Sequence, residues 1–233
     1  LVLCAGRPPF GVRPYYELLG LAQEDEYVIV DNGCAIHRTS DWKVIDSVAL
    51  DKQDIHYLYS LTQNSSIQLT LFDEEHYFVV GETPSPIVVR DTGYVFTSPT
   101  EISLEEAVSG KYTMFQAMFL AEKETVDFFE EKYASDICQR FSGVRSQDVI
   151  YEVMPAGVTK AFALEKLAKK LGIPSEDIMA LGDANNDLEM LKFAGLGIAM
   201  GNASDYVKSL ADDVTDPNDE NGVAKAIEKY LLN

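Results

Sequence analysis

The stretch that decides the fold is IMALGDANNDLEMLKFAGLGIAM, which spans residues 178–200. It contains two short apolar runs, 178–181 and 196–200, of the length that is typical of buried strands. Between them, residues 187–194 carry the pattern of a helix, and Gly195 is a typical helix end. This strand–helix–strand order predicts two parallel strands that are joined by a right-handed crossover.

The alternation of helices and short apolar segments continues on both sides of this stretch. The other predicted elements are a strand at 1–4, a helix at 12–19, a strand at 27–30, a helix at 160–171, a short helix from about residue 205, a short segment at 213–215 and a helix at 223–231. Such alternation predicts a Rossmann-like α/β core, in which helices cover both faces of a parallel sheet.

Residues 48–151 follow a different pattern, in which a strand pair and helices replace the regular alternation. The apolar runs 67–71 and 77–80 predict a β-hairpin, and helical patterns near 54–62 and 122–133 flank it. The simplest explanation is an α+β domain that is inserted into a discontinuous α/β core. The predicted domains are a first core segment at 1–47, the insert at 48–151 and a second core segment at 152–233.

The composition argues against several classes of partner and enzyme. The formal net charge of -19 disfavours nucleic acid or an anionic membrane as a partner, because like charges repel. No apolar run has transmembrane length, and the three distant cysteines form no disulfide or zinc pattern, so the predicted location is cytoplasmic. The sequence also lacks the glycine motifs of dinucleotide dehydrogenases and P-loop proteins. No pattern indicates an oligomeric state.

Polar residues follow the first strand of the quoted stretch, at the end where ligands bind in open α/β sheets. Gly182 allows a sharp turn, Asp183 follows it, and Asp187 stands at the start of the next helix. Two carboxylates and the amide of Asn186 suit a hard cation such as Mg²⁺. The alternative is that Asp183 or Asn186 only caps the helix, with Asp187 in its favourable first turn. These residues alone leave both possibilities open.

Two cationic residues stand at comparable positions. Lys160 follows an extended segment, 151–154, and begins a helix, where a positive charge opposes the helix dipole. A bound anion explains this lysine better than a structural role does. Arg7 follows the first predicted strand, but it is a weaker indication because most surface arginines are only solvated.

Five motifs occur together in a fixed order. They are Leu3-Cys4-Ala5-Gly6-Arg7-Pro8, Asp31-Asn32-Gly33-Cys34, Val158-Thr159-Lys160, Gly182-Asp183-Ala184-Asn185-Asn186-Asp187 and Ala199-Met200-Gly201-Asn202-Ala203. The set resembles the Cof-type branch of the haloacid dehalogenase superfamily, and most of all its YidA-like sugar phosphatases. Each motif is weak alone, whereas the ordered set is specific. The resemblance covers the whole chain, although the insert matches only in length and pattern.

The resemblance implies a Mg²⁺-dependent phosphomonoester hydrolase that acts on small phosphorylated metabolites. Sugar phosphates are the expected class, and flavin or pyridoxal phosphates are open alternatives. The reaction would proceed through an aspartyl-phosphate intermediate. The resemblance assigns Asp183 to the metal, with Asn186 and Asp187 in support, and Lys160 to the transferring phosphate. Lys160 and Asp187 are thus the predicted catalytic residues. The insert would be a type C2 cap that closes over the substrate.

The resemblance also implies which residues contact the substrate. The turn at Gly6 and Arg7 would face the phosphate, and Asn32 and Gly33 would line the cleft beneath the cap. The predicted substrate-binding set is completed by Asn186 and Asn202. For Asn202, its position near a strand end favours a turn or a helix cap over contact with the substrate.

The chain departs from the family pattern in three places. The Asp-x-Asp-Gly-Thr motif of the first core strand, which carries the nucleophile and the acid/base aspartate, is absent from the sequence. In the family this motif lies upstream of the Gly-Arg-Pro turn. We therefore expect a core that lacks its first strand, in a phosphatase that is truncated or incompletely recorded. The chain as given is expected to be inactive. Ala5 stands where Ser or Thr is usual, and Ala161 where Gly is usual. These alanines give some weight to the alternative, a non-catalytic relative that binds a metal or a phosphorylated metabolite.

Overall fold

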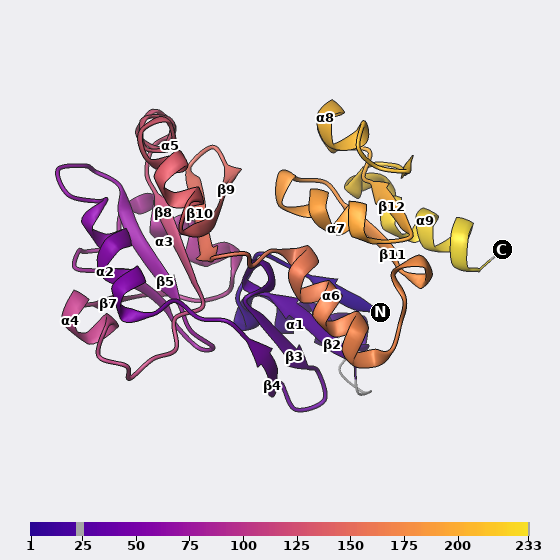
Figure 1. Ribbon diagram of the computed structural model, residues 1–233, viewed down its shortest axis with the longest axis horizontal. Coiled ribbons are helices and arrows are strands. Elements are labelled where there is room, and N and C mark those ends of the chain that lie inside the picture. The colour runs from indigo at the N-terminus through magenta and orange to yellow at the C-terminus, as the bar shows by residue number, and fades with distance from the viewer. Residues whose placement is uncertain (22–25, 233) are drawn as a thin grey trace. The chain divides into compact units, whose positions relative to one another are not determined.

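A computed structural model describes residues 1–21 and 26–232 of the chain. The chain divides into two compact units, Leu1–Val158 and Thr159–Asn233. The first unit contains a four-stranded and a six-stranded sheet, and the second contains a three-stranded sheet (Figure 1). The α/β class that the sequence predicts is therefore confirmed. The division into two core segments and an insert stays a prediction.

The four-stranded sheet has the order β1-β2-β3-β4. Strand β1 (Val2–Cys4) pairs parallel to β2 (Tyr27–Val30), while β3 (Ala35–Arg38) and β4 (Val44–Ser47) continue the sheet antiparallel. Helix α1 (Pro9–Leu19) connects the two parallel strands. It begins before the predicted residue 12, because Pro9 takes the first helical position, which needs no backbone donor.

The six-stranded sheet has the order β7-β6-β5-β8-β10-β9. Its strands are β5 (Gln68–Phe72), β6 (Tyr77–Val80), β7 (Pro99–Ile102), β8 (Gln116–Leu120), β9 (Phe141–Gln147) and β10 (Ile150–Pro155), and its helices are α2 (Lys52–Ser60), α3 (Pro86–Tyr94), α4 (Leu104–Ala107) and α5 (Lys123–Cys138). The predicted hairpin is confirmed as the antiparallel pair β5–β6.

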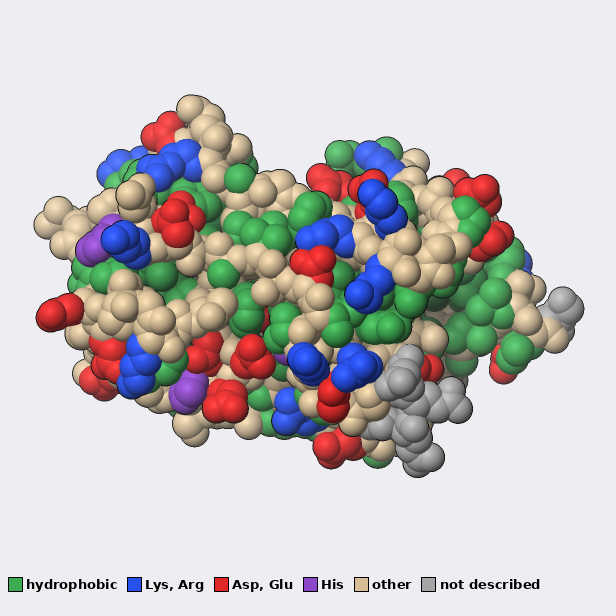
Figure 2. Space-filling model, turned by 60° about the horizontal axis from the view of Figure 1, so that its bottom comes forward, with side chains coloured by type: hydrophobic (Ala, Val, Ile, Leu, Met, Phe, Trp, Pro, Cys, Tyr) green, Lys and Arg blue, Asp and Glu red, His purple; other side chains and the backbone are tan. Residues whose placement is uncertain are grey.

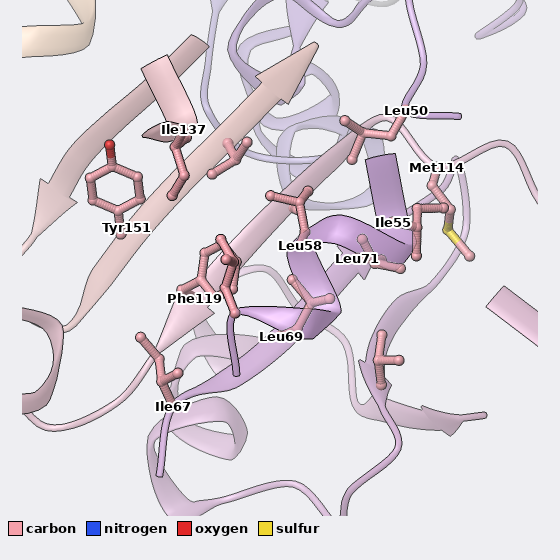
Figure 3. Packing of buried hydrophobic residues seen from close by; sticks show 14 of the residues in the cluster. Leu50, Ile55, Leu58, Ile67, Leu69, Leu71, Met114, Phe119, Ile137 and Tyr151 are labelled. Carbon is pink, nitrogen blue, oxygen red and sulfur yellow. The ribbon is translucent and has the colours of Figure 1, made fainter. Parts of the chain in front are cut away.

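Helices cover both faces of the six-stranded sheet. Side chains of α2 and α5 pack with one set of strand residues, and side chains of α3 pack with the other. Figure 3 shows Leu58 of α2 gathered with Leu69 and Leu71 of β5 in the larger core. Because both faces are covered, every residue of β5, β6, β8 and β10 is buried. A polar residue inside these strands must therefore find its hydrogen bonds in the interior.

The second unit has a fully parallel sheet in the order β11-β12-β13. Its strands are β11 (Met179–Gly182), β12 (Leu196–Ala199) and β13 (Asp213–Val214), and its helices are α6 (Lys160–Leu171), α7 (Leu188–Phe193), α8 (Asp205–Lys208) and α9 (Gly222–Leu231). Helix α6 has the predicted bounds, because the Thr159 side chain caps its first turn and Gly172 ends it in the left-handed conformation.

The helix that was expected at about 187–194 is confirmed as α7 (Leu188–Phe193), to within one residue at each end. It is preceded by a 3₁₀ turn, Asn185–Asp187, whose last side chain accepts hydrogen bonds from the amides of Asp183 and Ala184.

Two surface features bear on the possible partners. Figure 2 shows Asp and Glu side chains spread among cationic and hydrophobic side chains over the face in view, rather than gathered in one patch. In the part of the chain that the structure describes, no helix is long and apolar enough to cross a membrane.

Candidate functional site

The Asp187 carboxylate organises the polar residues of the second unit. Its Oδ1 accepts a hydrogen bond from Lys160 Nζ at 2.6 Å, and its Oδ2 accepts from the backbone amides of Asp183 at 2.9 Å and Ala184 at 3.0 Å. The pair is buried, since Lys160 is 7% and Asp187 4% exposed. Charge-assisted hydrogen bonds of this kind are strong in a low-dielectric interior. Asp187 therefore fixes both the lysine and the turn after β11.

Gly182 makes this arrangement possible. A Cβ at this position would lie 2.4 Å from Asp187 Cβ and 2.7 Å from its Cγ, so no larger residue fits without a shift of Asp187. The sharp turn that the sequence predicts at Gly182 is thus a steric requirement of the carboxylate that packs over it.

We expect Gly182→Ala to lower the free energy of unfolding by about 1–3 kcal/mol, the usual effect of overpacking a tight contact. Gly93→Ala is the matched control. Gly93 lies in α3 with nothing within 4 Å of an added Cβ, so alanine is expected to stabilise the helix by roughly 0.5–1 kcal/mol. Urea unfolding of both variants measures the difference. Equal effects in the two variants would contradict the steric role of Gly182.

Asp183 follows β11, as the sequence predicts, and it contacts Asn202, which follows β12. The Asn202 side-chain amide donates to Asp183 Oδ2 at 2.8 Å, and its Oδ1 accepts from the backbone amide of Asn218 at 3.0 Å. Asn202 thus has the turn-stabilising contact that its position favoured. The Asp183 side chain is exposed, and Asn186 lies half-buried in the 3₁₀ turn.

These donors fit Mg²⁺ in chemistry but form an incomplete set. An exposed carboxylate at a strand end and a neighbouring amide suit a cation that prefers oxygen and keeps several waters. Within residues 1–21 and 26–232, no group of three or more His, Cys, Asp or Glu side chains is arranged to hold a metal. Three donors already contact Asp187, so Asp183 is the more accessible ligand of the two. The ligand roles of Asp183, Asn186 and Asp187 stay predictions.

In the first unit, two backbone turns bring the other predicted residues together. The amide of Asn32 donates to the carbonyl of Ala5 at 3.1 Å, and the amide of Asp31 donates to the carbonyl of Arg7 at 3.0 Å. A Cβ at Gly6 would lie 3.0 Å from Asn32 Oδ1. Gly6, Arg7 and the turn at Asp31–Gly33 therefore form one assembly.

The Asn32 side chain is buried and directed at the six-stranded sheet. Its Nδ2 donates to Gln116 Oε1 at 3.3 Å and to Glu152 Oε2. Sequence reasoning missed Gln116 of β8 and Glu152 of β10. A signal existed, because each is a polar residue in an otherwise apolar strand, QAMFL and IYEVMP. Whether Asn32 and Gly33 also contact a substrate stays a prediction.

Asp31 belongs to one of the five motifs, but no role was predicted for it. Its side chain is fully buried, and neither carboxylate oxygen has a hydrogen-bond partner among the described residues. Burial raises the pKa of Asp31 well above its usual value, and the negative charges of Glu152 and Asp73 raise it further. The same burial, with the nearby Asp31 and Glu152, raises the pKa of the Cys34 thiol. The Asp31 carboxyl is therefore favoured in its neutral, protonated form.

Arg7 lies against an aromatic side chain of α1. Its Nη1 donates to the Tyr15 hydroxyl at 3.1 Å, and its guanidinium carbon lies 5.5 Å from the centre of the Tyr15 ring.

The predicted residues form two assemblies. One consists of Gly6, Arg7, Asn32 and Gly33, and the other of Lys160, Asp183, Asn186, Asp187 and Asn202. A single site that contains both assemblies stays a prediction.

Known proteins resemble this sequence over its whole length. The family model described as haloacid dehalogenase-like hydrolase matches residues 1–227. YxeH of Bacillus subtilis is 32% identical over 232 residues, which cover 100% of this chain and 86% of that protein. Phosphatase YwpJ of the same organism is 30% identical, with 100% and 87% covered. The chain is also 56% identical over 81 residues to the B. subtilis 5-amino-6-(5-phospho-D-ribitylamino)uracil phosphatase YcsE. These residues cover 35% of this chain and 32% of YcsE.

Solved structures agree with these relatives. A haloacid dehalogenase-like hydrolase from Bacteroides thetaiotaomicron superposes with a TM-score of 0.86 at 27% identity, over 98% of this chain and 85% of that one. The subclass IIB sugar phosphatase BT4131 superposes with a TM-score of 0.83 at 24% identity, over 100% and 85%. At that identity the second likeness shows the fold alone.

Proposed function

The chain belongs to the haloacid dehalogenase-like hydrolases and is a phosphatase of that family, and from this premise we propose that it hydrolyses small phosphorylated metabolites, such as sugar phosphates, with Mg²⁺. The observation that carries the proposal is the buried pair of Lys160 and Asp187 beside the exposed carboxylate of Asp183. It supplies a fixed cation for a phosphate group and an accessible oxygen ligand for a metal.

The residues of the second unit would act mainly through charge and position. The Lys160 ammonium, which Asp187 orients, would donate hydrogen bonds to the phosphoryl oxygens and offset their negative charge. Asp183 would hold the metal, with Asn186 and Asp187 in support. Bound Mg²⁺ supplies further positive charge at the transferring group. Because Asp187 already holds its partners through three hydrogen bonds, little reorganisation would be needed when the substrate binds.

We further propose that the nucleophile and the acid/base aspartate lie outside these 233 residues, since no Asp-x-Asp pair occurs among them. The phosphoryl group would pass to the nucleophilic aspartate, and hydrolysis of that aspartyl-phosphate would release phosphate. The second candidate is a non-catalytic relative that binds the same metabolites. Ala5 favours it, because the missing hydroxyl would remove one hydrogen bond to a charged phosphate, worth about 1.5–3 kcal/mol.

Phosphate release from a panel of phosphomonoesters separates these candidates. The product of the native gene is expected to release phosphate with Mg²⁺ and to stop when EDTA removes the metal, and the 233-residue chain alone is expected to be inactive. Glu189→Gln, an exposed change on α7, serves as a control that should keep full activity. Release that is independent of the metal would contradict the proposal. Absence of any release by the native product would favour the non-catalytic candidate.

A further inference from the structure

The four-stranded and six-stranded sheets of the first unit meet at a buried polar contact. Asn32, in the turn after β2, donates hydrogen bonds from its Nδ2 to Gln116 of β8 and to Glu152 of β10. Within these residues the chain passes from the first sheet to the second only once, at residues 48–51. A contact between two sheets that share one covalent link can open like a hinge, and the bonds of Asn32 oppose such an opening.

Apolar packing also joins α1 to the six-stranded part of the unit. Phe10 of α1 packs against the buried cluster that contains Val88 of α3 and Met118 of β8. A Cβ at Gly11 would lie 3.0 Å from Val95 Cβ, so α1 and the end of α3 approach closely. The polar side chains of the contact are buried as well. The structure therefore shows the contact in a closed state.

The closed contact leaves some of its polar atoms without a hydrogen bond. Among the described residues, neither carboxyl oxygen of Asp31 has a partner, and neither does Nε2 of Gln116. Burial of such groups is unfavourable, and water would solvate them if the two sheets separated. The bonds of Asn32 thus favour the closed state, whereas Asp31 and Gln116 disfavour it. This balance is typical of a two-state element.

The charged side chains that act on Asp31 make the balance sensitive to protons. Burial raises the pKa of Asp31 well above its usual value, and the negative charges of Glu152 on β10 and of Asp73 after β5 raise it further. The neighbouring Cys34 thiol also has a raised pKa. Arg7 offers Asp31 its backbone carbonyl, while its guanidinium lies against a tyrosine of α1. The closed state therefore binds a proton at Asp31 more tightly than an open, solvated state does.

From this geometry we propose that the turn at 31–33 is a proton-linked latch, in which Asn32 holds the two sheets together and closure takes up one proton at Asp31. Raising the pH ionises Asp31 and favours the open state, where water solvates the carboxylate, and lowering the pH favours the closed state. The latch lies within the first unit. It goes beyond the proposed function, and its test needs neither substrate nor metal.

The Cys34 thiol reports on the opening, because it is fully buried beside Asp31, whereas Cys138 on α5 is exposed. The native gene product is labelled with iodoacetamide near pH 6, 7 and 8, and the modification of each cysteine is followed by mass spectrometry of its peptide. The labelling rate of the urea-unfolded protein, divided by that of the folded protein at the same pH, gives a protection factor. This ratio removes the pH dependence of the thiol itself.

The protection factor of Cys34 is expected to fall by up to about tenfold for each pH unit, while Cys138 shows little protection at any pH. The opening should be local, so the protection of Cys34 should be smaller than global unfolding allows and should change little in low concentrations of urea. Protection of Cys34 that follows global unfolding in urea would overturn the proposal.

Three variants separate the two parts of the latch from general stability. Asp31→Asn should abolish the pH dependence of Cys34 protection and raise this protection near pH 8. Asn32→Gly removes the latch bonds but tolerates the φ of 53°, and it should lower the protection about tenfold. Gln68→Leu is the control, because Gln68 is buried on β5 and its hydrogen bonds stay within the six-stranded part, at residues 82–85, so Cys34 protection should not change.

Two outcomes with these variants would contradict the latch. A pH dependence that persists in Asp31→Asn would assign the proton to another group. Equal losses of Cys34 protection in Asn32→Gly and Gln68→Leu would show that general destabilisation is the cause. The comparison of Asn32→Gly with Gln68→Leu remains decisive for the latch bonds even if Asp31→Asn does not fold.

Discussion

Asp187→Ala is expected to lower the free energy of unfolding by about 3–5 kcal/mol, because it leaves the buried Lys160 ammonium without its partner. The same change removes the acceptor for the amides of Asp183 and Ala184, so the turn after β11 also loses its anchor. Urea unfolding monitored by circular dichroism measures the loss. Few single substitutions have effects of this size, and this mechanism is specific to a buried, paired charge.

Two further variants show whether the unpaired charge is the cause. Glu189→Ala changes an exposed carboxylate on the neighbouring α7 and is expected to shift stability by less than about 0.5 kcal/mol. The double variant Lys160→Met with Asp187→Leu removes both charges and should recover the part of the lost stability that is due to the unpaired ammonium, since apolar replacement of a buried pair is often close to neutral. The part that is due to the amides of Asp183 and Ala184 should remain lost. A double variant as unstable as Asp187→Ala would refute the charge explanation.

Asp31→Asn is expected to raise the free energy of unfolding near pH 8 and to change it much less near pH 4. The folded state raises the pKa of Asp31 through burial, aided by Glu152 and Asp73, so it binds the proton more tightly than the unfolded chain does. The tighter proton binding by the folded state stabilises it fully at pH values below the pKa that Asp31 has in the unfolded chain. This stabilisation is lost as the pH rises toward the higher pKa that Asp31 has in the folded protein. The loss amounts to about 1.4 kcal/mol for each pH unit in this window.

The substitution isolates the charge because asparagine has nearly the shape of aspartate and tolerates the same positive φ, which is 51° at this position. Asp136→Asn is the control, an exposed aspartate on α5 in the same unit. Urea unfolding at several pH values should show a gain for Asp31→Asn that grows with pH, and none for the control. A variant that is less stable than the parent near pH 8 would contradict a neutral Asp31.

The elements that the sequence predicts well are those whose signals are local. The bounds of α6 and β2 were correct, because a capping threonine, a terminal glycine and a short apolar run all lie within the segment itself. Asp183 was correctly expected at the end of β11, since it directly follows a short apolar run, whereas its contact with Asn202 was not predicted. The motifs also led to the family, which the comparisons show.

Other parts depend on contacts that no local pattern reports. Asn32 reaches Gln116 and Glu152 across 84 and 120 residues of sequence, and periodicity contains no information about such pairs. The hydrogen bonds from the amides of Asp183 and Ala184 to the Asp187 side chain were likewise not predicted. The left-handed conformation of Phe96 contradicts the usual preference of its residue type, so the sequence argues against it.

The rate of phosphate release by the native gene product at saturating Mg²⁺ tests the role of the buried lysine most directly. Lys160→Met is expected to lower kcat by about 10²–10³, because it removes a fixed cation from the transferring phosphate. Lys169→Met, an exposed change on the same helix, should leave the rate unchanged. If Lys160→Met is unstable, the double variant with Asp187→Leu should show an equal or greater loss. A folded variant without Lys160 that retained the parent rate would contradict the proposed site.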